Sequence, residues 1–272
     1  KGGKVYSNVQ ASDMLEALKI VPDFSYPDKE FYKLDYVHYA GSDADFYFIR
    51  NTTPEWISRQ CSFRQKNKVP EIWNPVTGDI VAVPIYNQDE HYINLPVSLA
   101  PYGSTFVVFK QGKSAGQYSG FNKVETPPLM DFTKDGIFLW EPGTFSLARQ
   151  DGEKTVTNRM KVQDLDGAWE VFFPEGLGAP KRAIFPKLIS WTESDQEGIR
   201  YFSGTATYKK MFEYEVHSDA LKKKRLYLDL GDLSHVGEVW LNEKPLGITW
   251  AKPHRFDVTD ILKPGYNTIV IE

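Results

Sequence analysis

Apolar and polar residues alternate along most of this chain with a period of two, the pattern of half-buried β-strands. In the segment 45–50, Phe46 and Phe48 fall on one face of the predicted strand, and Tyr47 and Ile49 fall on the other. The segment 56–64 repeats the pattern, and its apolar face carries Ile57, Cys61 and Phe63. The alternation therefore predicts β-strands that bury one side.

Turn residues separate these segments at regular intervals. Residues 74–79 contain Asn, Pro, Gly and Asp, and predict a hairpin that joins 72–73 to 80–85. Residues 101–104 predict a further hairpin between 92–99 and 105–109. Short strands at regular spacing indicate antiparallel sandwiches.

Three regions follow from this pattern. Residues 1–24 differ from the rest: 4–6 predict a short strand, and Ser12 or Asp13 is expected to cap a helix that runs through Leu18. This region is interpreted as the remnant of a preceding α/β unit, with a small decoration on the first sandwich as the alternative. Residues 25–125 predict one β-sandwich, and residues 130–272 predict a second. The predicted fold class is therefore mainly β, with two antiparallel β-sandwich modules.

The second module has its own inward and outward positions. Between 226 and 230 the leucines are expected to point inward, and Tyr227 and Asp229 outward. Trp240 lies on the outward face of its strand, between Val239 and Leu241 on the inward face. An inter-domain contact is therefore favoured for Trp240 over a ligand contact.

Composition and charge exclude several classes of function. The 272 residues are 41% hydrophobic and 25% charged, and the net charge of −4 shows no footprint for nucleic acid. The basic run 222–225 is expected to be a solvated turn. No apolar run approaches the roughly 20 residues of a membrane span. The chain starts at Lys1 and stops within a strand-like pattern, so we expect both ends to be cut from a longer polypeptide.

The sequence shows no arrangement of acidic residues, histidines or cysteine that is typical of a catalytic site. Glycoside hydrolysis needs two carboxyl groups across the scissile bond, and the acidic pairs are expected to be turn or surface carboxylates: Asp43 with Asp45, Glu213 with Glu215, Asp229 with Asp232, and Asp257 with Asp260. The histidines are scattered without metal-ligand spacing, at 38, 91, 217, 235 and 254. Cys61 is expected to be a buried, inert thiol.

The candidates that remain are for carbohydrate binding. Aromatic rings can stack on the C–H groups of sugars while polar neighbours orient the hydroxyls. Two segments have this composition, and their candidate residues are Trp191 and Glu193 in one and Trp250, His254 and Arg255 in the other. The alternative, that Trp191 and Trp250 pack under loops or against another domain, is favoured. A structural Ca²⁺ could use oxygen donors such as Asp164, Asp166, Asp229 and Asp232, but no spacing assigns a metal or any other cofactor.

Several motifs resemble a known family. The stretches 198–212 (GIRYFSGTATYKKMF), 228–247 (LDLGDLSHVGEVWLNEKPLG) and 256–267 (FDVTDILKPGYN) are similar to galactose-binding-like jelly rolls of glycosidases. Together with PDF at 22–24, PEIWNP at 70–75 and GSTFVVF at 103–109, they resemble the C-terminal, non-catalytic region of glycoside hydrolase family 106, the α-L-rhamnosidases.

The resemblance implies an accessory role. The catalytic carboxylates of that family lie on a barrel, and nothing in this chain resembles the barrel. The expected partners are that barrel, in the same polypeptide, and carbohydrate, and the expected location is periplasmic or secreted. Two alternatives are a stand-alone carbohydrate-binding module without hydrolase activity and a purely structural spacer. A scaffold is expected to expose an apolar patch at Trp240 or Trp250.

Overall fold

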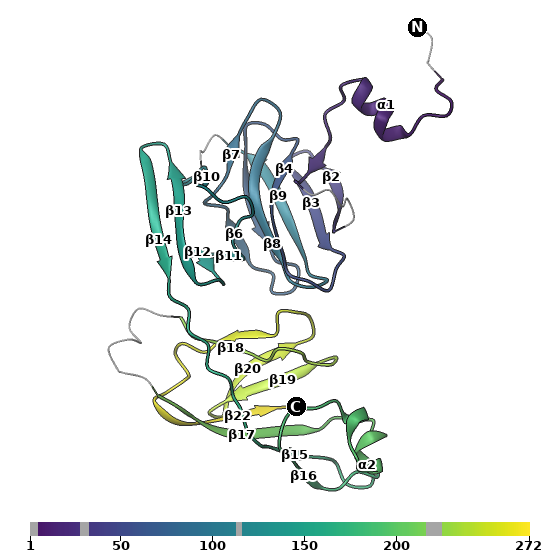
Figure 1. Ribbon diagram of the computed structural model, residues 1–272, viewed down its shortest axis with the longest axis vertical. Helices are drawn as coiled ribbons and strands as arrows, with labels where there is room; N and C mark the ends of the chain where they lie inside the picture. The colour runs from purple at the N-terminus through teal and green to yellow at the C-terminus, as the bar shows by residue number, and fades with distance from the viewer. Residues whose placement is uncertain (1–4, 28–32, 113–115, 216–224) are drawn as a thin grey trace. The chain divides into compact units, whose positions relative to one another are not determined.

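The computed structural model describes residues 5–27, 33–112, 116–215 and 225–272 (Figure 1). The chain divides into two compact units, Lys1–Lys161 and Val162–Glu272, which are described separately below. The prediction of a mainly β fold is confirmed, because antiparallel sheets build both units.

Two antiparallel sheets form the sandwich of the first unit. The four-stranded sheet has the order β1-β4-β8-β7, with β1 (Phe24–Ser25), β4 (Ile57–Phe63), β8 (Ile93–Leu99) and β7 (Asn87–Gln88). The five-stranded sheet has the order β2-β3-β9-β5-β6, with β2 (Leu34–Ala40), β3 (Ala44–Asn51), β9 (Ser104–Gln111), β5 (Lys68–Trp73) and β6 (Ile80–Ala82).

The alternation predicted for β3 and β4 is confirmed. Tyr47 and Ile49 are buried in the core, whereas Phe46 and Phe48 lie on the other side of the sheet. The core also takes the inward residues of β4 and β8, among them Ile57, Cys61, Phe63, Ile93 and Leu95. Each large apolar side chain buried in this way contributes about 1.5–3 kcal/mol to folding.

The predicted hairpin between β8 and β9 is wrong, because the two strands lie in different sheets. Both this connection and the one from β3 to β4 cross from one sheet to the other. The buried side chain of Asn51 fixes the two crossings, since its Nδ2 donates to the carbonyls of Ala100 (2.8 Å) and Glu55 (2.6 Å). The backbone is closely packed there, since a Cβ on Gly103 would lie 3.1 Å from the Ala100 carbonyl oxygen.

The boundary between the units lies later than the sequence analysis placed it. Residues 130–161, predicted to start the second sandwich, belong to the first unit. They include β11 (Met130–Thr133), β12 (Gly136–Leu139), β13 (Gly143–Arg149) and β14 (Gly152–Asn158), and β10 (Gly120–Phe121) pairs with β13. Packing explains the difference: Leu147 joins a buried cluster with Ile85 and Tyr118, and the Met130 amide donates to Ser98 Oγ (3.2 Å).

The N-terminal segment contains one short helix, α1 (Ala11–Ala17). The predicted cap is wrong: the N-cap is Gln10 without a side-chain hydrogen bond, and Ser12 Oγ instead donates to the carboxylate of its neighbour Asp13. Val5 and Tyr6 are not in a strand, and Lys4 lies outside the described residues. No residue of α1 is buried, so packing does not fix its start.

The second unit is also a sandwich. Its main sheet has the order β16-β15-β17-β22-β19-β20, with β16 (Arg182–Phe185), β15 (Trp169–Phe172), β17 (Thr207–Tyr214), β22 (Gly265–Ile271), β19 (Gly237–Leu241) and β20 (Lys244–Thr249). The second sheet pairs β18 (Tyr227–Asp229) with β21 (Arg255–Asp257). A short 3₁₀ helix, η1 (Trp191–Glu193), and α2 (Glu197–Arg200) precede β17. The leucines of 226–230 pack on the core as predicted.

Candidate functional site

Three of the five residues predicted to bind carbohydrate follow β20: Trp250 and His254 in the loop before β21, and Arg255 as the first residue of β21. Strand pairing brings a second loop, 230–236, beside it. Gly237 pairs with Thr249, and Asp229 pairs with Arg255, so the two loops leave neighbouring strands at the same end of the unit.

Trp250 is one of three exposed apolar side chains at this sheet edge. It is 61% exposed, Ile248 on β20 is 63% exposed, and Val236, which precedes the Gly237–Thr249 pair, is 59% exposed. We call Val236, Ile248 and Trp250 the Trp250 strip. Trp240 lies on the outward face of β19, as predicted, and is half-buried, whereas Val239 and Leu241 are in the core.

His254 is buried beneath this loop. Its side chain is 3% exposed, and Nδ1 lies 2.8 Å from the hydroxyl of Thr249, while its carbonyl accepts from the Leu230 amide (2.9 Å). Burial lowers the pKa of His254 below its ordinary value, and the positive charge of Lys252 lowers it further. The buried ring therefore braces its own loop against Thr249, and the backbone carbonyl of His254 links this loop to Leu230. A sugar would not reach the ring there.

Ion pairs engage the charged residues of the loop. Arg255 Nε donates to Asp229 Oδ2 (2.6 Å), and Lys252 pairs with Asp232. These are two of the four carboxylates considered for Ca²⁺, and the other two, Asp164 and Asp166, are exposed. Over the described ranges, no group of three or more His, Cys, Asp or Glu side chains could hold a metal ion.

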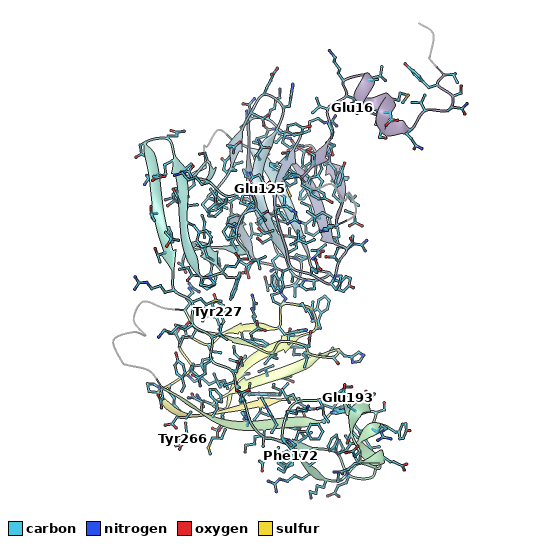
Figure 2. All side chains as sticks on the ribbon, in the orientation of Figure 1. Glu16, Glu125, Phe172, Glu193, Tyr227 and Tyr266 are labelled. Carbon is cyan, nitrogen blue, oxygen red and sulfur yellow. The ribbon has the colours of Figure 1, made fainter. Side chains whose placement is uncertain are left out.

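Trp191 and Glu193 lie on η1, which precedes α2 in the chain, and Glu193 is labelled in Figure 2. The indole of Trp191 packs edge-on against Phe173 and Phe202, and its Nε1 donates to the hydroxyl of Tyr208 (2.5 Å). Burial raises the pKa of Tyr208. Trp191 thus packs under the loops, while Glu193 is exposed. A carbohydrate contact by any of the five residues stays a prediction.

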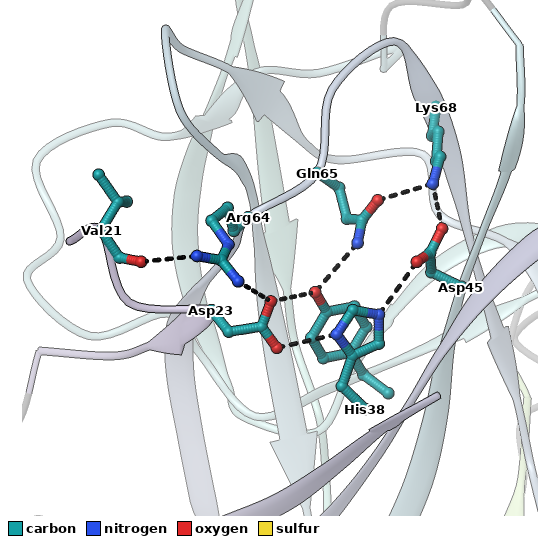
Figure 3. Close-up of polar contacts among 8 residues, drawn as sticks. Val21, Asp23, His38, Asp45, Arg64, Gln65 and Lys68 are labelled. Carbon is teal, nitrogen blue, oxygen red and sulfur yellow. Dashed lines mark hydrogen bonds and ion pairs between the residues drawn. The ribbon is translucent and has the colours of Figure 1, made fainter. Parts of the chain in front are cut away.

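A cluster of charged and polar side chains closes one end of the first sandwich, and the sequence analysis did not foresee it (Figure 3). Its centre is the ring of His38 on β2. His38 Nδ1 lies 2.9 Å from Asp23 Oδ2, and Nε2 lies 3.0 Å from Asp45 Oδ1. The ring stacks on Tyr47, with centroids 4.0 Å apart. We call these residues, with Arg64, Gln65 and Lys68, the His38 cluster.

Further hydrogen bonds connect the side chains of the cluster (Figure 3). The Tyr47 hydroxyl donates to Asp23 (3.2 Å) and accepts from Gln65 Nε2 (3.0 Å), and Lys68 Nζ donates to Gln65 Oε1 (2.9 Å) and to Asp45. Burial raises the pKa of Asp45, but hydrogen bonds from Lys68 and His38 outweigh it, so the pKa is lowered overall.

The prediction that Asp45 is a turn or surface carboxylate is wrong. Asp45 lies on β3, is only 7% exposed, and shares the inward face with Tyr47. Its position two residues before Tyr47 was the available signal, because residues i and i+2 of a strand face the same side. Its partner Asp43 is exposed, as are the other predicted acidic pairs.

The His38 cluster contains two carboxylates, Asp23 and Asp45, but it does not have the geometry of a glycosidase pair. Such a pair leaves a gap in which a glycosidic oxygen, a sugar or a water lies. Here the imidazole of His38 fills the space between the two carboxylates, and each also accepts from a cation, Arg64 or Lys68. The cluster joins the segment at Asp23 to both sheets, so its role is to stabilise the fold.

The remaining nucleophile and histidine predictions concern single residues. Cys61 is fully buried in the core, and burial raises the pKa of its thiol, so the expected inert thiol is confirmed. His91 and His235 are exposed, and His217 lies outside the described residues, as do Lys222 to Lys224 of the basic run.

In the part of the chain that the structure describes, no helix is long and apolar enough to cross a membrane.

Comparisons with known proteins add the family context. Residues 1–88 match the model of the α-L-rhamnosidases, glycoside hydrolase family 106, and residues 191–272 match the galactose-binding-like domain of glycosyl hydrolase family 2. The rhamnosidase from Novosphingobium sp. PP1Y superposes on 96% of the chain with a TM-score of 0.67 and 25% identity. The chain resembles a family 106 rhamnosidase. This confirms the resemblance, including the galactose-binding-like domain at the C-terminal end.

The rhamnosidase-like chain is much shorter than the proteins it matches. It spans 21% of the Novosphingobium rhamnosidase. A curated relative from Formosa agariphila, named "Putative beta-glucuronidase", is 40% identical over 145 residues, which are 51% of this chain and 12% of that protein. Glycoside hydrolase domains are therefore shared with both.

Proposed function

We propose that this chain is an accessory region of a glycoside hydrolase that acts on rhamnose-containing glycans. It contributes surfaces that support a catalytic domain, rather than catalytic groups. The matches to the α-L-rhamnosidase and galactose-binding-like models support the class of enzyme. A periplasmic or secreted location is part of the proposal and follows from the same resemblance.

The observation that carries the proposal is the Trp250 strip. Val236, Ile248 and Trp250 lie on or next to the paired strands β19 and β20 and are each more than half exposed. Contiguous exposed apolar surface with charged neighbours is typical of a protein–protein or inter-domain contact. The charged residues beside it, Lys252 and Asp232, are paired with each other.

The buried groups support the same view. His254 and the His38 cluster are fully engaged in holding loops and sheets, and neither leaves a carboxylate and a gap for a substrate. We therefore infer that His254 and the His38 cluster stabilise the fold. The Trp250 strip is the surface that contacts the catalytic domain of the same enzyme.

The test measures the fluorescence of a hydrophobic dye, 8-anilinonaphthalene-1-sulfonate, bound to the 272-residue chain. Trp250→Lys and Ile248→Lys are expected to reduce the fluorescence strongly without changing the circular dichroism. Leu188→Lys is the matched control, since Leu188 is also exposed in the second unit but lies off the strip. Equal fluorescence in all four proteins would remove the docking surface from the proposal.

A further inference from the structure

The outward face of the five-stranded sheet in the first unit carries an apolar strip that runs across all five strands. The strand register aligns Val37, Phe48, Phe106, Trp73 and Ile80 in one row, from β2 through β3, β9 and β5 to β6. The neighbouring row, two residues along each strand, contains Tyr39, Phe46, Val108 and Glu71. These two rows are called the aromatic strip.

The rings of the aromatic strip contact one another. Phe48 and Phe106 lie 5.0 Å apart, Phe46 meets Trp73 edge-on at 5.7 Å, and Tyr39 lies 6.3 Å from Phe46. Val108 is buried beneath them, whereas Tyr39 is 68% exposed. The strip therefore presents ring surface to solvent on a rigid sheet.

Charged residues border the strip along both sides. Beyond the first row lies the bidentate pair of Arg50 with Asp35, where Arg50 Nη2 is 2.6 Å from Asp35 Oδ2. Beyond the second row lies Lys110, whose Nζ is 2.8 Å from Glu71 Oε2 and 5.3 Å from the centre of the Trp73 ring. Trp73 Nε1 donates to the same Glu71 carboxylate (2.8 Å). Donors and acceptors thus flank an apolar centre.

The size of the strip favours a small, elongated ligand over a protein. With strands about 4.8 Å apart and residues on one face about 7 Å apart, two rows across five strands cover roughly 24 Å by 14 Å, or about 300 Å². A stable interface between separate proteins needs about 800 Å² on each partner. A contact between domains of one polypeptide, as proposed for the Trp250 strip, needs less area because the chain holds the domains together. A linear oligosaccharide fits a strip of this shape.

We propose that the aromatic strip binds glycans rich in 6-deoxyhexoses such as rhamnose. A 6-deoxyhexose has a methyl group where other hexoses have a hydroxymethyl group, so it offers more apolar surface to rings and needs fewer polar partners. The bordering Arg50, Asp35, Lys110 and Glu71 would take the remaining hydroxyls. The choice of sugar rests on the proposed function, and the site itself rests on the register and ring contacts.

The experiment uses isothermal titration calorimetry of the 272-residue chain with an α-L-rhamnose oligosaccharide. Methyl α-L-rhamnoside and methyl α-L-mannoside, which differ only in the hydroxyl at C6, are compared by nuclear magnetic resonance titration. We expect binding of the oligosaccharide, and about tenfold weaker binding of the mannoside than of the rhamnoside. Shifts are expected at β2, β3, β9 and β5. Equal affinity for both monosaccharides would overturn the 6-deoxyhexose assignment.

Variants locate the binding. Tyr39→Ala is expected to weaken oligosaccharide affinity about fivefold, and Tyr102→Ala, a tyrosine of similar exposure in a loop of the same unit, is the matched control. Loss of binding in Trp250→Ala but not in Tyr39→Ala would move the site to the second unit and overturn the proposal. So would self-association that Tyr39→Lys abolishes in the absence of any sugar binding. None of these outcomes depends on the dye experiment at the Trp250 strip.

Discussion

The two units of the chain use a histidine in different ways: His38 is half-buried, whereas His254 is buried. In the first unit, His38 lies between the carboxylates of Asp23 and Asp45, and Asp45 also pairs with Lys68. In the second unit, His254 is buried against the hydroxyl of Thr249, and burial lowers its pKa. The first unit therefore uses charge inside its sandwich, and the second keeps its buried ring neutral.

The difference shows what each unit needs at the end of its sandwich. The His38 cluster ties three strands of one sheet to the segment before β1 and the end of β4, and charges with several partners hold such distant pieces in place. The two loops at His254 leave neighbouring paired strands, so one neutral hydrogen bond and a backbone contact are enough. In both units the buried ionisable groups support the fold.

The largest expected effect comes from breaking the charge cluster of the first unit. Lys68→Ala leaves the buried Asp45 without its main cation and should lower the free energy of unfolding by about 3 kcal/mol. The matched change in the second unit, Lys252→Ala, removes a lysine–aspartate pair at the surface and should have no measurable effect. Urea unfolding followed by hydrogen exchange of peptides from each unit measures both.

If Lys252→Ala proved as costly as Lys68→Ala, the contrast between the buried and the surface pair would be lost. Lys68→Met serves as a second variant, because it keeps the length of the side chain. It should destabilise as Lys68→Ala does, since the lost charge and not the lost packing is responsible.

The stability of the two units should respond differently to acid. The pKa of folded His254 lies below the ordinary 6.5, so its stabilising contribution is complete above about pH 6.5 and is lost as the pH falls through the folded value. The pKa of Asp45 is lowered from 3.8, so its contribution persists until the pH falls below that value. Between pH 6.5 and about 4.5, His254 should therefore lower the free energy of unfolding of the second unit, while the contribution of Asp45 to the first unit stays unchanged.

The measurement is thermal unfolding of wild type and His254→Gln at several pH values in this window. Each bound proton contributes at most about 1.4 kcal/mol per pH unit, and the variant should show a smaller loss than wild type. Identical pH dependence of the two proteins would mean that His254 does not hold the loops in its neutral form.

The smallest expected effect compares two tryptophans of the second unit. Trp191→Phe keeps an aromatic ring against Phe173 but removes the donor to Tyr208, and should cost about 1 kcal/mol. Trp250→Phe changes an exposed ring and should stay within about 0.5 kcal/mol of wild type. Urea unfolding checks both, and a larger cost for Trp250→Phe would mean that this indole is packed.

The alternation of residues predicted the fold class and the buried faces. Successive side chains of a strand point to opposite faces of the sheet, and this parity depends only on the local sequence. Tyr47, Cys61 and Val239 point inward and Trp240 outward for that reason. Parity does not say which sheet a strand joins, so the crossing from β8 to β9 was not foreseen. Nor does it show that residues 130–161 pack on the first sandwich, since the contact of Leu147 with Ile85 is long-range.

The site was less predictable than the fold for the same reason. Parity places Asp45 beside Tyr47, but its partners His38 and Lys68 come from strands that only the tertiary structure brings together. Likewise, Trp191 and Trp250 have similar loop contexts in the sequence, yet one is packed against Phe202 and the other is exposed. The aromatic strip could not be predicted from the sequence, because its residues are aligned only by the register of five strands.

The most direct test of the central claim, that this chain acts through its surfaces, is hydrolysis of an aryl α-L-rhamnoside by the purified 272-residue chain. The account predicts a rate equal to the buffer blank, and the same rate for Asp23→Asn and Asp45→Asn. Release of the aryl group above the blank, abolished by either substitution, would contradict it and make the His38 cluster a catalytic site.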